Sequence, residues 1–581
     1  MRLPFPFPQF LLKSASLKSA YNGLRGPLIA AVLAFLCALP VALLLPAMDR
    51  DESRFTQATA QMLESHDFIN INFQQTPRWK KPAGIYWLQA MSVAMTSSVE
   101  ARDILAWRWP SLLGAALAAF ACAWGGARAF GTRVGTKAGL LFAVSFMLST
   151  EGAFARSDAV LCGFITLFMA AMARIYLATR DLAPDAPKPK LFKEQSVLWL
   201  AMAAAIMTKG PEAALVMALT LITLGIWDRK WRWMKHLSFG WGLILVLALC
   251  GPWAVAITIT TDGGFWGGAV GHDLATKFNG KSEGHSALPG YHTLFLPFIF
   301  FPVSWLLGGA IQTAIFRRHE AAIRYAIAWF VPTFLFFELL PTKLPHYTLP
   351  ALGGLAWLAA VSLDVPLKAW ARWLNLGLGV LGGLVLSLVA VVGWKQFGSS
   401  WSLLFAVVTL LGGLGLGGLG GWLIWRRFRR RGFLTLLAAG VVCHLGFVAT
   451  AASLKPLWVS RAMEHALVAA HLDPRTGIAP GPVATLGYSE PSFVFRMGTA
   501  TELYNDDAKG AAGALAGGQP LFVESRYEQA FLDAAAAQGI TPHEVTEVDG
   551  QDYSNGHAVK LKLYDNPAPT PPAADQTDTA Q

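Results

Sequence analysis

Long apolar runs, almost free of charged residues, recur along most of this 581-residue chain. Many are about 20 residues long, which is the length that a helix needs to cross the hydrocarbon core of a bilayer. Charged residues make up only 14% of the chain, whereas soluble domains carry about a quarter. The sequence therefore predicts an all-α polytopic membrane protein. Its five cysteines all lie inside apolar runs and are expected to be small core residues.

The apolar runs divide into thirteen predicted spans. The fifth and sixth are short and could instead form one broken helix, which would invert the topology of everything after them. With thirteen spans and the N-terminus inside, the dense basic clusters, including Arg426–Arg431, fall inside, as the positive-inside rule requires. A merged span would place that cluster outside. The predicted spans lie at about 28–48, 104–124, 136–150, 158–178, 196–208, 212–227, 237–258, 292–315, 322–340, 347–363, 370–394, 402–424 and 432–453.

Domain boundaries follow from these spans. Residues 1–27 are predicted to be a cytoplasmic N-terminus, and residues 28–455 form the membrane domain. Its outside loops at 49–103 and 259–291 are too long to be simple turns. The first of them is the predicted catalytic loop, with helices lying at the membrane interface.

The C-terminal region changes character. Residues 456–564 are predicted to form a small α/β domain outside the membrane, and the Pro-rich tail 565–581 is predicted to be disordered. Strands are expected at about 482–488, 521–524 and 558–564, and a helix at about 527–538.

The net charge of +11 does not indicate a nucleic-acid partner. Residues 456–581 hold 7 Lys and Arg against 16 Asp and Glu, which leaves 40 against 20 for the rest of the chain. Much of that excess lies in short loops between apolar runs. This distribution is typical of membrane topology and phosphate binding, not of a DNA-binding domain.

The first outside loop carries the strongest chemical signal. Asp51 follows a span and opens a helical pattern, so that Asp51 or Ser53 can cap the helix. A carboxylate at a helix N-terminus is kept ionised by the dipole and the backbone donors. Arg54 lies one turn further on, where it could hold a phosphate.

The segment from Thr76 to Trp87 places three cations, Arg78, Lys80 and Lys81, among aromatic residues at the membrane surface. Interface anchoring explains the aromatic residues. It explains the cations poorly, because the positive-inside rule disfavours such a cluster outside. A lipid phosphate would account for them.

Further polar residues fall on the same predicted side. Asp158 opens the fourth span, and two outside acids near helix ends can share one task, although each can also be a simple cap. The loop 259–291 carries His272, Asp273, Lys277, Lys281, Glu283 and His285, and residues 341–350 add Lys343, His346 and Tyr347. His272 could be a metal ligand, but no tight ligand spacing surrounds it.

Taken in order, these motifs read D-E-x-R, W-x-K-P-x-x-x-Y-W, A-R-x-D-x-x-L, T-K-G-P and K-L-P-H-Y-x-L-P. This set resembles the polyprenyl-phosphate-dependent glycosyltransferases of the aminoarabinose transferase and protein mannosyltransferase superfamily, especially the branch that modifies lipid A. The resemblance covers about 28–350 in motifs and the whole chain in architecture. It implies a GT-C type membrane fold of about thirteen spans with a periplasmic active site.

The resemblance also implies roles for individual residues. Asp51 matches the essential acid of the first loop, and Asp158 the second acid. Arg54 and Lys81 match donor-phosphate ligands, while His272 and Lys277 resemble a His-x4-basic element with Lys where Arg is usual. We add Lys277 and Lys343 to the predicted phosphate ligands, and we place Glu52, Tyr86, His346 and Tyr347 in the substrate pocket.

One departure concerns a divalent metal. The family often has Glu at the position of Lys80, and that Glu with the histidine resembles a metal-binding pair. With Lys80 there, no cofactor is assigned, although Asp49 and Glu52 are possible substitutes for the missing ligand and His272 stays the candidate metal residue.

The predicted function is transfer of a sugar, aminoarabinose or a related one, from a polyprenyl phosphate to lipid A or another envelope acceptor. The alternatives are transfer of hexose, galacturonic acid or mannose to core oligosaccharide or protein. A lipid flippase or transporter is less favoured, because transporters usually carry charges at mid-membrane and show repeated halves. We expect a monomer in the bacterial inner membrane, in contact with membrane lipids, whose active site and C-terminus are periplasmic.

Overall fold

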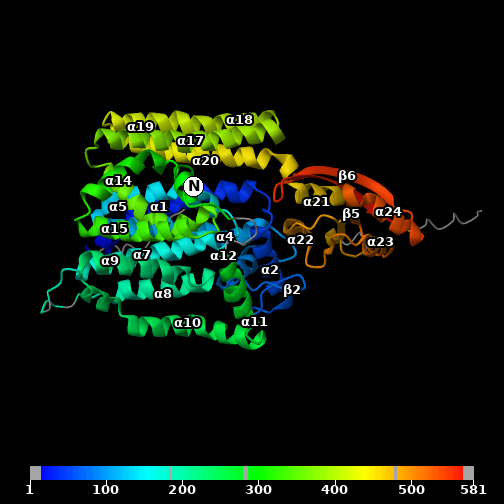
Figure 1. Cartoon of the computed structure of the whole chain (residues 1–581), viewed down its shortest axis with the longest axis horizontal. Coiled ribbons are helices and arrows are strands. Elements are labelled where there is room, and N and C mark those ends of the chain that lie inside the picture. Colours follow the sequence, from blue (N-terminus) through cyan, green and yellow to red (C-terminus); the bar gives the residue numbers. More distant parts are fainter. Residues whose placement is uncertain (1–14, 184, 188, 279–285, 477–480, 567–581) are drawn as a thin grey trace, which may run out of the picture.

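The computed structural model describes residues 15–183, 185–187, 189–278, 286–476 and 481–566. Helices run alongside one another in a bundle, and a smaller C-terminal unit projects from one end of it (Figure 1). The predictions for residues 1–14, for Lys281, Glu283 and His285, and for the tail from residue 567 lie outside the described residues.

Eight helices among these residues are long and apolar enough to cross a membrane. A ninth span results if the bent pair α13 (Tyr291–Ile299) and η4–α14 (Val303–Phe316) is counted as one. The eight are α1 (Ala15–Leu44), α4 (Ile104–Phe130), α7 (Asp158–Thr179), α10 (Phe239–Thr260), α15 (Ala321–Leu339), α17 (Ala369–Phe397), Ser400–Trp425, which comprises α18 (Ser400–Leu410), η6 (Leu411–Leu416) and α19 (Gly417–Trp425), and α20 (Arg429–Ser453).

The other predicted spans coincide with shorter or interrupted helices. They are α5 (Thr132–Ala143) with α6 (Phe146–Glu151), α8 (Phe192–Lys209), α9 (Glu212–Asp228), and η5 (Pro345–Ala351) with α16 (Leu352–Ser362). Between α8 and α9, Gly210 has a φ of +84°, a conformation that favours glycine. Pro211 then precedes the first residue of α9. Helical structure is thus present at every predicted position, while the count of thirteen spans stays a prediction.

Small residues let α4 and α7 pack closely. A Cβ atom added to Gly114 would lie 2.7 Å from the backbone of Val160, and one added to Gly163 would lie 2.6 Å from the carbonyl oxygen of Gly114. Such close approach between membrane helices typically requires small residues. The packing fixes the start of α7, and with it Asp158, against the neighbouring helix.

The first loop folds into α2 (Asp51–Ser65), a short hairpin of β1 (Asn72–Phe73) and β2 (Thr76–Pro77), and α3 (Gly84–Thr96). Neither Asp51 nor Ser53 caps α2, contrary to the prediction: the N-cap residue is Arg50, without a side-chain capping bond. Instead the backbone N–H of Met48 donates to Glu52 (2.8 Å), and the Ser53 hydroxyl donates to the Met48 carbonyl (2.5 Å).

The C-terminal unit contains a five-stranded sheet with the order β4-β3-β5-β7-β6. The central pair of β3 and β5 is parallel, as is β3 with β4, and β7 runs antiparallel to both β5 and β6. Strands occur at all three predicted positions and a helix at the fourth. The elements are β3 (Ala484–Leu486), α22 (Pro491–Met497), β4 (Glu502–Tyr504), α23 (Ala508–Ala516), β5 (Leu521–Glu524), α24 (Glu528–Ala537), β6 (His543–Asp552) and β7 (His557–Asp565).

This unit docks on the first loop. The ring of Phe495 from α22 packs edge-on against Trp107 of α4, with the ring centroids 5.1 Å apart. The Gln57 amide of α2 donates to the hydroxyl of Thr499 (2.7 Å), and the Ser492 N–H donates to the Asp49 carboxylate (3.1 Å). The C-terminal unit is therefore held beside the loop that carries the predicted active site.

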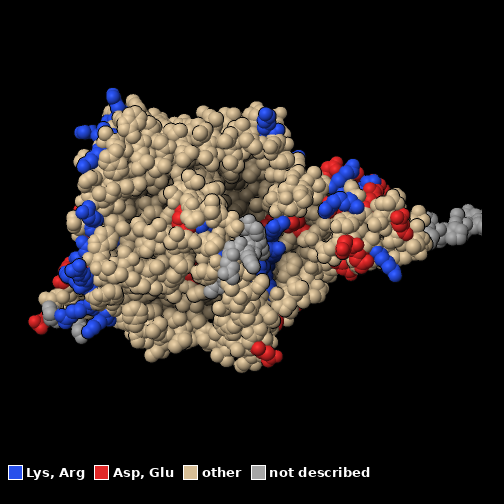
Figure 2. All heavy atoms as spheres, in the orientation of Figure 1, with Lys and Arg blue, Asp and Glu red and all other residues tan. Residues whose placement is uncertain are grey.

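Charge is unevenly distributed over the molecule. Lys and Arg gather at the end of the helix bundle that lies away from the C-terminal unit (Figure 2). The long face between the two ends is almost uncharged in this view, as expected for a surface that contacts lipid tails. The membrane orientation, with the C-terminal unit outside, stays a prediction that agrees with this distribution.

Candidate active site

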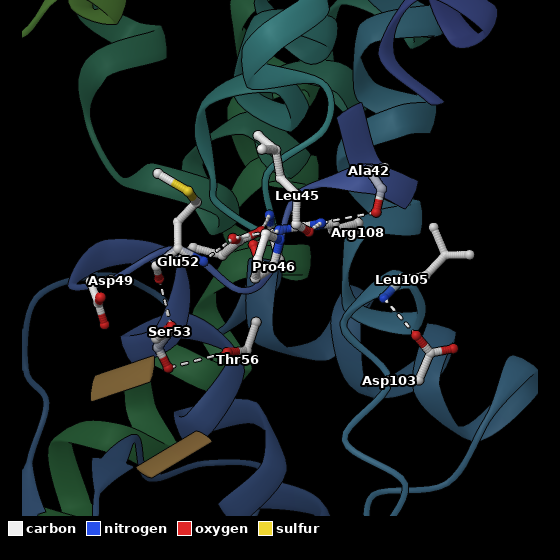
Figure 3. A network of polar contacts seen from close by, with 12 residues as sticks. Ala42, Leu45, Pro46, Asp49, Glu52, Ser53, Thr56, Asp103, Leu105 and Arg108 are labelled. Carbon is white, nitrogen blue, oxygen red and sulfur yellow. Dashed lines mark hydrogen bonds and ion pairs between the residues drawn. The ribbon is translucent and has the colours of Figure 1, made fainter. Parts of the chain in front are cut away.

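A buried ion pair anchors the start of the first loop. Arg108 of α4 is fully buried and donates from Nε and Nη2 to the two carboxylate oxygens of Glu52, each at 2.8 Å. Its other donor bonds reach the carbonyls of Ala42, Leu45 and Pro46 at the end of α1 (Figure 3). Glu52 also accepts from the N–H of Ala155 (2.7 Å). Glu52 therefore joins three chain segments, which differs from its predicted place in the substrate pocket.

Asp51 is the neighbour of Glu52, yet it faces a cavity. The cavity has a volume of about 450 Å³ and is also lined by Arg50, Glu151, Arg156 and His346. Burial by itself would raise the pKa of Asp51, but the positive charges of Arg156 and Arg78 outweigh this and lower it. Asp51 is thus held ionised at the cavity wall.

A chain of charged groups links this cavity to Asp158. Arg156 pairs with Glu151 (2.7 Å), whose carboxylate lies 3.6 Å from Nδ1 of His346. The Nε2 atom of His346 lies 3.6 Å from Asp158. Asp158 in turn accepts a 2.7 Å hydrogen bond from the ammonium of Lys209, at the end of α8. Arg156, Glu151 of α6 and His346 of η5 therefore lie between the two predicted acids, and Lys209 of α8 follows beyond Asp158.

Lys209 extends the network further. Its ammonium lies 3.2 Å from Glu212, across the α8–α9 break, and 5.3 Å from the centre of the Tyr347 ring. A cation over an aromatic face is attracted by the ring quadrupole. The T-K-G-P turn, which the sequence marks only as a break between spans, thus brings a cation to the site.

A second cation cluster joins the two long loops. Asp273 accepts from Lys81 (3.3 Å) and from Lys277 (2.8 Å) at the same carboxylate oxygen. Burial and the charge of Lys277 lower the pKa of Lys81 to about 7, against the opposing effect of Asp273. Lys277 lies in α12 (Ala275–Phe278), and its carbonyl accepts from Thr342 (3.4 Å), so the 259–291 loop rests on the 341–350 segment.

Other predicted site residues have different surroundings. Lys343 is buried and donates to the carbonyls of Glu338 (2.6 Å) and Leu340 (2.5 Å), which stabilises the end of α15. Its contact with a donor phosphate stays a prediction. Arg54 is half-buried on α2 and is not among the residues lining the cavity around Asp51. Tyr86 is fully buried, with its ring 5.4 Å from that of Phe55.

The described residues show no metal site around His272. His272 is exposed on η3 (Gly267–Leu274). Within the described part of the chain, no group of three or more His, Cys, Asp and Glu side chains is arranged to hold a metal ion. Glu52 is saturated by Arg108 and two backbone donors and is not available to a metal. Asp49 accepts from the N–H of Ser492, and its place as a substitute ligand stays a prediction.

Several buried polar atoms around the site have no hydrogen-bond partner among the described residues. They are Nε of Arg78, the Tyr86 hydroxyl, Oε2 of Glu151, Nε of Arg156 and Oε1 of Glu212. Buried polar groups are nearly always satisfied in proteins, so each exception calls for an explanation. Their gathering near Asp51 and Asp158 is expected of a site that binds a polar ligand.

No protein-family model matches the chain. An undecaprenyl phosphate-α-4-amino-4-deoxy-L-arabinose arabinosyl transferase of Pseudomonas paraeruginosa is 26% identical over 436 residues, 74% of this chain and 75% of that protein. A transferase of the same name from Erwinia tasmaniensis is 29% identical over 349 residues, 58% of this chain and 60% of that protein. The resemblance predicted from the motifs is confirmed.

Solved structures show a similar fold. The crystal structure of ArnT from Cupriavidus metallidurans bound to undecaprenyl phosphate superposes with a TM-score of 0.71 at 19% identity. The match covers 94% of this chain and 98% of that one, and the apo structure of the same protein gives a TM-score of 0.67. The membrane bundle and the C-terminal unit therefore belong to one shared architecture.

Sequence reasoning identified most of the charged centre but missed its connections. Glu151 lies at the end of a predicted span, and Arg156, Lys209 and Asp273 were noted only as members of motifs or loops. The available signal was that each is a charged residue at the outside end of a predicted span or in an outside loop.

Proposed function

We propose that this protein transfers 4-amino-4-deoxy-L-arabinose from undecaprenyl phosphate to lipid A, at the outer face of the inner membrane. The observation that carries the proposal is that two acids, Asp51 and Asp158, lie close to the Lys81–Asp273–Lys277 cluster. The charge of Lys209, which binds Asp158, acts on Lys81, and the charges of Asp51 and Asp273 both act on Tyr86. The names of the homologous proteins and the shared fold support the donor.

The reaction requires displacement at the anomeric carbon of the sugar. The bond to the phosphate oxygen breaks, and its electron pair leaves with the polyprenyl phosphate, while an acceptor oxygen bonds to the same carbon. A phosphate leaving group needs positive charge close by more than it needs a proton. Lys81 and Lys277 supply this charge, and Asp273 holds the two ammonium groups together before the donor binds.

The two acids take different roles because their surroundings differ. Asp51 faces the cavity as a carboxylate and stabilises positive charge that develops on the sugar ring. Asp158 is bound by Lys209 and lies close to His346, so it orients these two side chains within the site. Arg156, which lines the cavity with Asp51, is placed to bind an anionic group of the acceptor.

An apolar groove of about 420 Å³ between α3, α4 and α7 accommodates a lipid chain in this proposal. Its lining includes Met91, Leu113 and Phe164, and Val160 of the same groove is half a turn from Asp158. A prenyl chain in this groove would leave its phosphate close to the charged end of α7.

The test is complementation of a deletion strain, read by mass spectrometry of lipid A. We expect the wild-type gene to restore the aminoarabinose adduct, and Asp51→Asn to lower its formation by orders of magnitude at equal expression. Asp262→Asn is the matched control, because it removes an exposed carboxylate from the 259–291 loop and should leave the adduct intact.

Near-normal modification by the Asp51→Asn protein would refute the role of Asp51. Unchanged lipid A in the deletion strain, with loss of a sugar from core oligosaccharide or glycoprotein instead, would replace the proposed acceptor while keeping the transferase.

A further inference from the structure

A second cavity lies at the basic end of the bundle, away from the C-terminal unit. It has a volume of about 330 Å³ and is formed where the α16–α17 loop meets the turn between α19 and α20. Figure 2 shows Lys and Arg gathered at this end of the molecule. Four arginines, Arg372, Arg426, Arg427 and Arg429, line the cavity.

The four arginines lack carboxylate partners. Among the described residues, none of the four lies within 4.0 Å of a carboxylate oxygen, and no acidic residue lines the cavity. The one acid of the α16–α17 loop, Asp364, pairs with Lys137 instead (2.8 Å). Arg372 and Arg429 donate to the carbonyls of Leu367 (3.1 Å) and Val365 (3.3 Å), but these neutral partners leave four positive charges around one opening. Such a cluster creates an attractive potential for an anion.

The wall of the cavity is apolar and rich in tryptophan. Trp373 and Trp425 meet edge to face with ring centroids 5.1 Å apart, and the Arg426 guanidinium lies 5.8 Å from the centre of the Trp422 ring. Trp305, only 2% exposed, forms part of the lining, and its indole N–H has no partner among the described residues. Tryptophans in membrane proteins concentrate where lipid headgroups meet hydrocarbon.

The positive-inside rule explains a basic turn between two spans, but it requires only charge in the loop. It does not require that four arginines converge on one cavity, or that tryptophans line the wall of this cavity. An apolar wall with a cationic rim matches the chemistry of a glycerophospholipid, whose phosphate lies at headgroup level and whose chains extend along the helices.

We infer that this cavity binds an anionic phospholipid, whose headgroup phosphate contacts Arg426, Arg427 and Arg429 while its chains cover α17 and α19. The bound lipid fills the space between the α16–α17 loop and the α19–α20 turn. It would stabilise the layer of α17 to α20, which lies on one side of the bundle in Figure 1. The site is separate from the candidate active site, so the inference does not depend on the proposed reaction.

The experiment compares two double variants within the same basic turn. Arg426→Gln/Arg427→Gln removes two charges from the cavity, and Arg430→Gln/Arg431→Gln removes two charges from exposed positions that do not line it. Both variants change loop charge equally, which controls for effects on topology. Native mass spectrometry of the full-length, delipidated protein measures binding of added cardiolipin, phosphatidylglycerol and phosphatidylcholine.

Each arginine near a headgroup contributes a factor of about five to anionic-lipid binding, so the cavity variant should bind cardiolipin about 30-fold more weakly than wild type. The control variant should stay within about fivefold of wild type. Phosphatidylcholine should not bind, and thermal stability should rise with cardiolipin or phosphatidylglycerol in wild type but not in the cavity variant.

Three results would overturn the inference. The first is an equal loss of cardiolipin binding in both variants, which would indicate general charge attraction. The second is phosphatidylcholine binding as strong as that of cardiolipin. The third is equal thermal protection by inorganic phosphate, which would indicate a site for a small anion. If the cavity variant is unstable, Arg427→Gln alone provides the second test, because it removes a single charge of the lining and should weaken cardiolipin binding about fivefold. Unaltered cardiolipin binding and unaltered stabilisation by cardiolipin in that variant would count against the site.

Discussion

Lys81 is the cation whose charge state we expect to control donor binding. Its pKa is lowered to about 7, because burial and the charge of Lys277 both disfavour the ammonium form. The sugar donor is a phosphodiester, whose negative charge does not change near neutral pH. The pH dependence of donor binding in this range therefore arises from the protonation of Lys81. The ammonium form binds the phosphate better, and donor use should therefore decline as the pH rises through 7.

The size of this effect follows from the pKa. The protonated fraction of Lys81 falls from about 0.9 at pH 6 to about 0.01 at pH 9, so kcat/KM for the donor should fall about 90-fold if only the ammonium form binds. The assay measures initial rates with purified donor at limiting concentration, in detergent or nanodiscs, from pH 6 to pH 9. Stability is measured at each pH to exclude unfolding.

Three variants separate this explanation from others. Lys81→Arg keeps its charge over the whole range and should flatten the profile. Lys277→Gln removes a charge that lowers the pKa of Lys81 and should move the midpoint to higher pH, whereas Asp273→Asn should move it to lower pH. A flat wild-type profile, or an unaltered step in Lys81→Arg, would refute the reasoning.

Three further predictions concern the framework of the site. Glu52→Gln leaves Arg108 buried without a counter-charge and should cost about 3–5 kcal/mol of unfolding free energy, measured by thermal unfolding. The control is Glu64→Gln, which removes one carboxylate from a partly exposed ion pair. It should cost at most about 1 kcal/mol of unfolding free energy. Lys343→Gln should lower the unfolding free energy by about 1–3 kcal/mol and leave the donor KM unchanged, because Lys343 stabilises the end of α15. A tenfold higher donor KM at normal stability would instead identify Lys343 as a phosphate ligand. Phe495→Ala should weaken docking of the C-terminal unit by about 3–5 kcal/mol. The measurement is the rate of proteolysis after α20, which should increase. A variant as resistant to protease as the wild type would contradict this docking role.

Hydropathy predicted the position of the helices because each apolar run must bury its backbone polar groups in a helix. It predicted less well where a helix is interrupted. The α13–α14 region bends by 103°. Pro297 lies in the last turn of α13 and Pro302 within the break itself. A proline marks such a point in the sequence, but the bend angle depends on tertiary packing.

Asp51 and Glu52 show the limit of reading a site from sequence. They are adjacent carboxylates at the start of the same helix, where successive residues point about 100° apart. One faces the cavity and the other faces Arg108. The partner of Glu52 lies 56 positions away in α4, inside an apolar run, and nothing in the spacing relates the two.

The charged network has the same limitation. Glu151, His346, Asp158 and Lys209 come from four different helices, and their order in the chain gives no sign that they form one connected series. The predicted topology places all four on the same side of the membrane, and for this reason the sequence motifs could be assigned to one site. Only the folded chain shows which cation pairs with which acid.

The electrostatics of Asp51 bear on the nature of the acceptor. A carboxylate whose pKa is lowered by Arg156 and Arg78 is a weak base, and proton abstraction is most effective when the pKa of the base is near the working pH. A sugar or serine hydroxyl would need such a base, whereas a lipid A phosphate is already ionised. The site holds one cation group around Asp273 and another around Asp51, so it can neutralise a leaving phosphate and an attacking phosphate at the same time. This arrangement favours a phosphate acceptor, with Asp51 stabilising the sugar's developing positive charge between them.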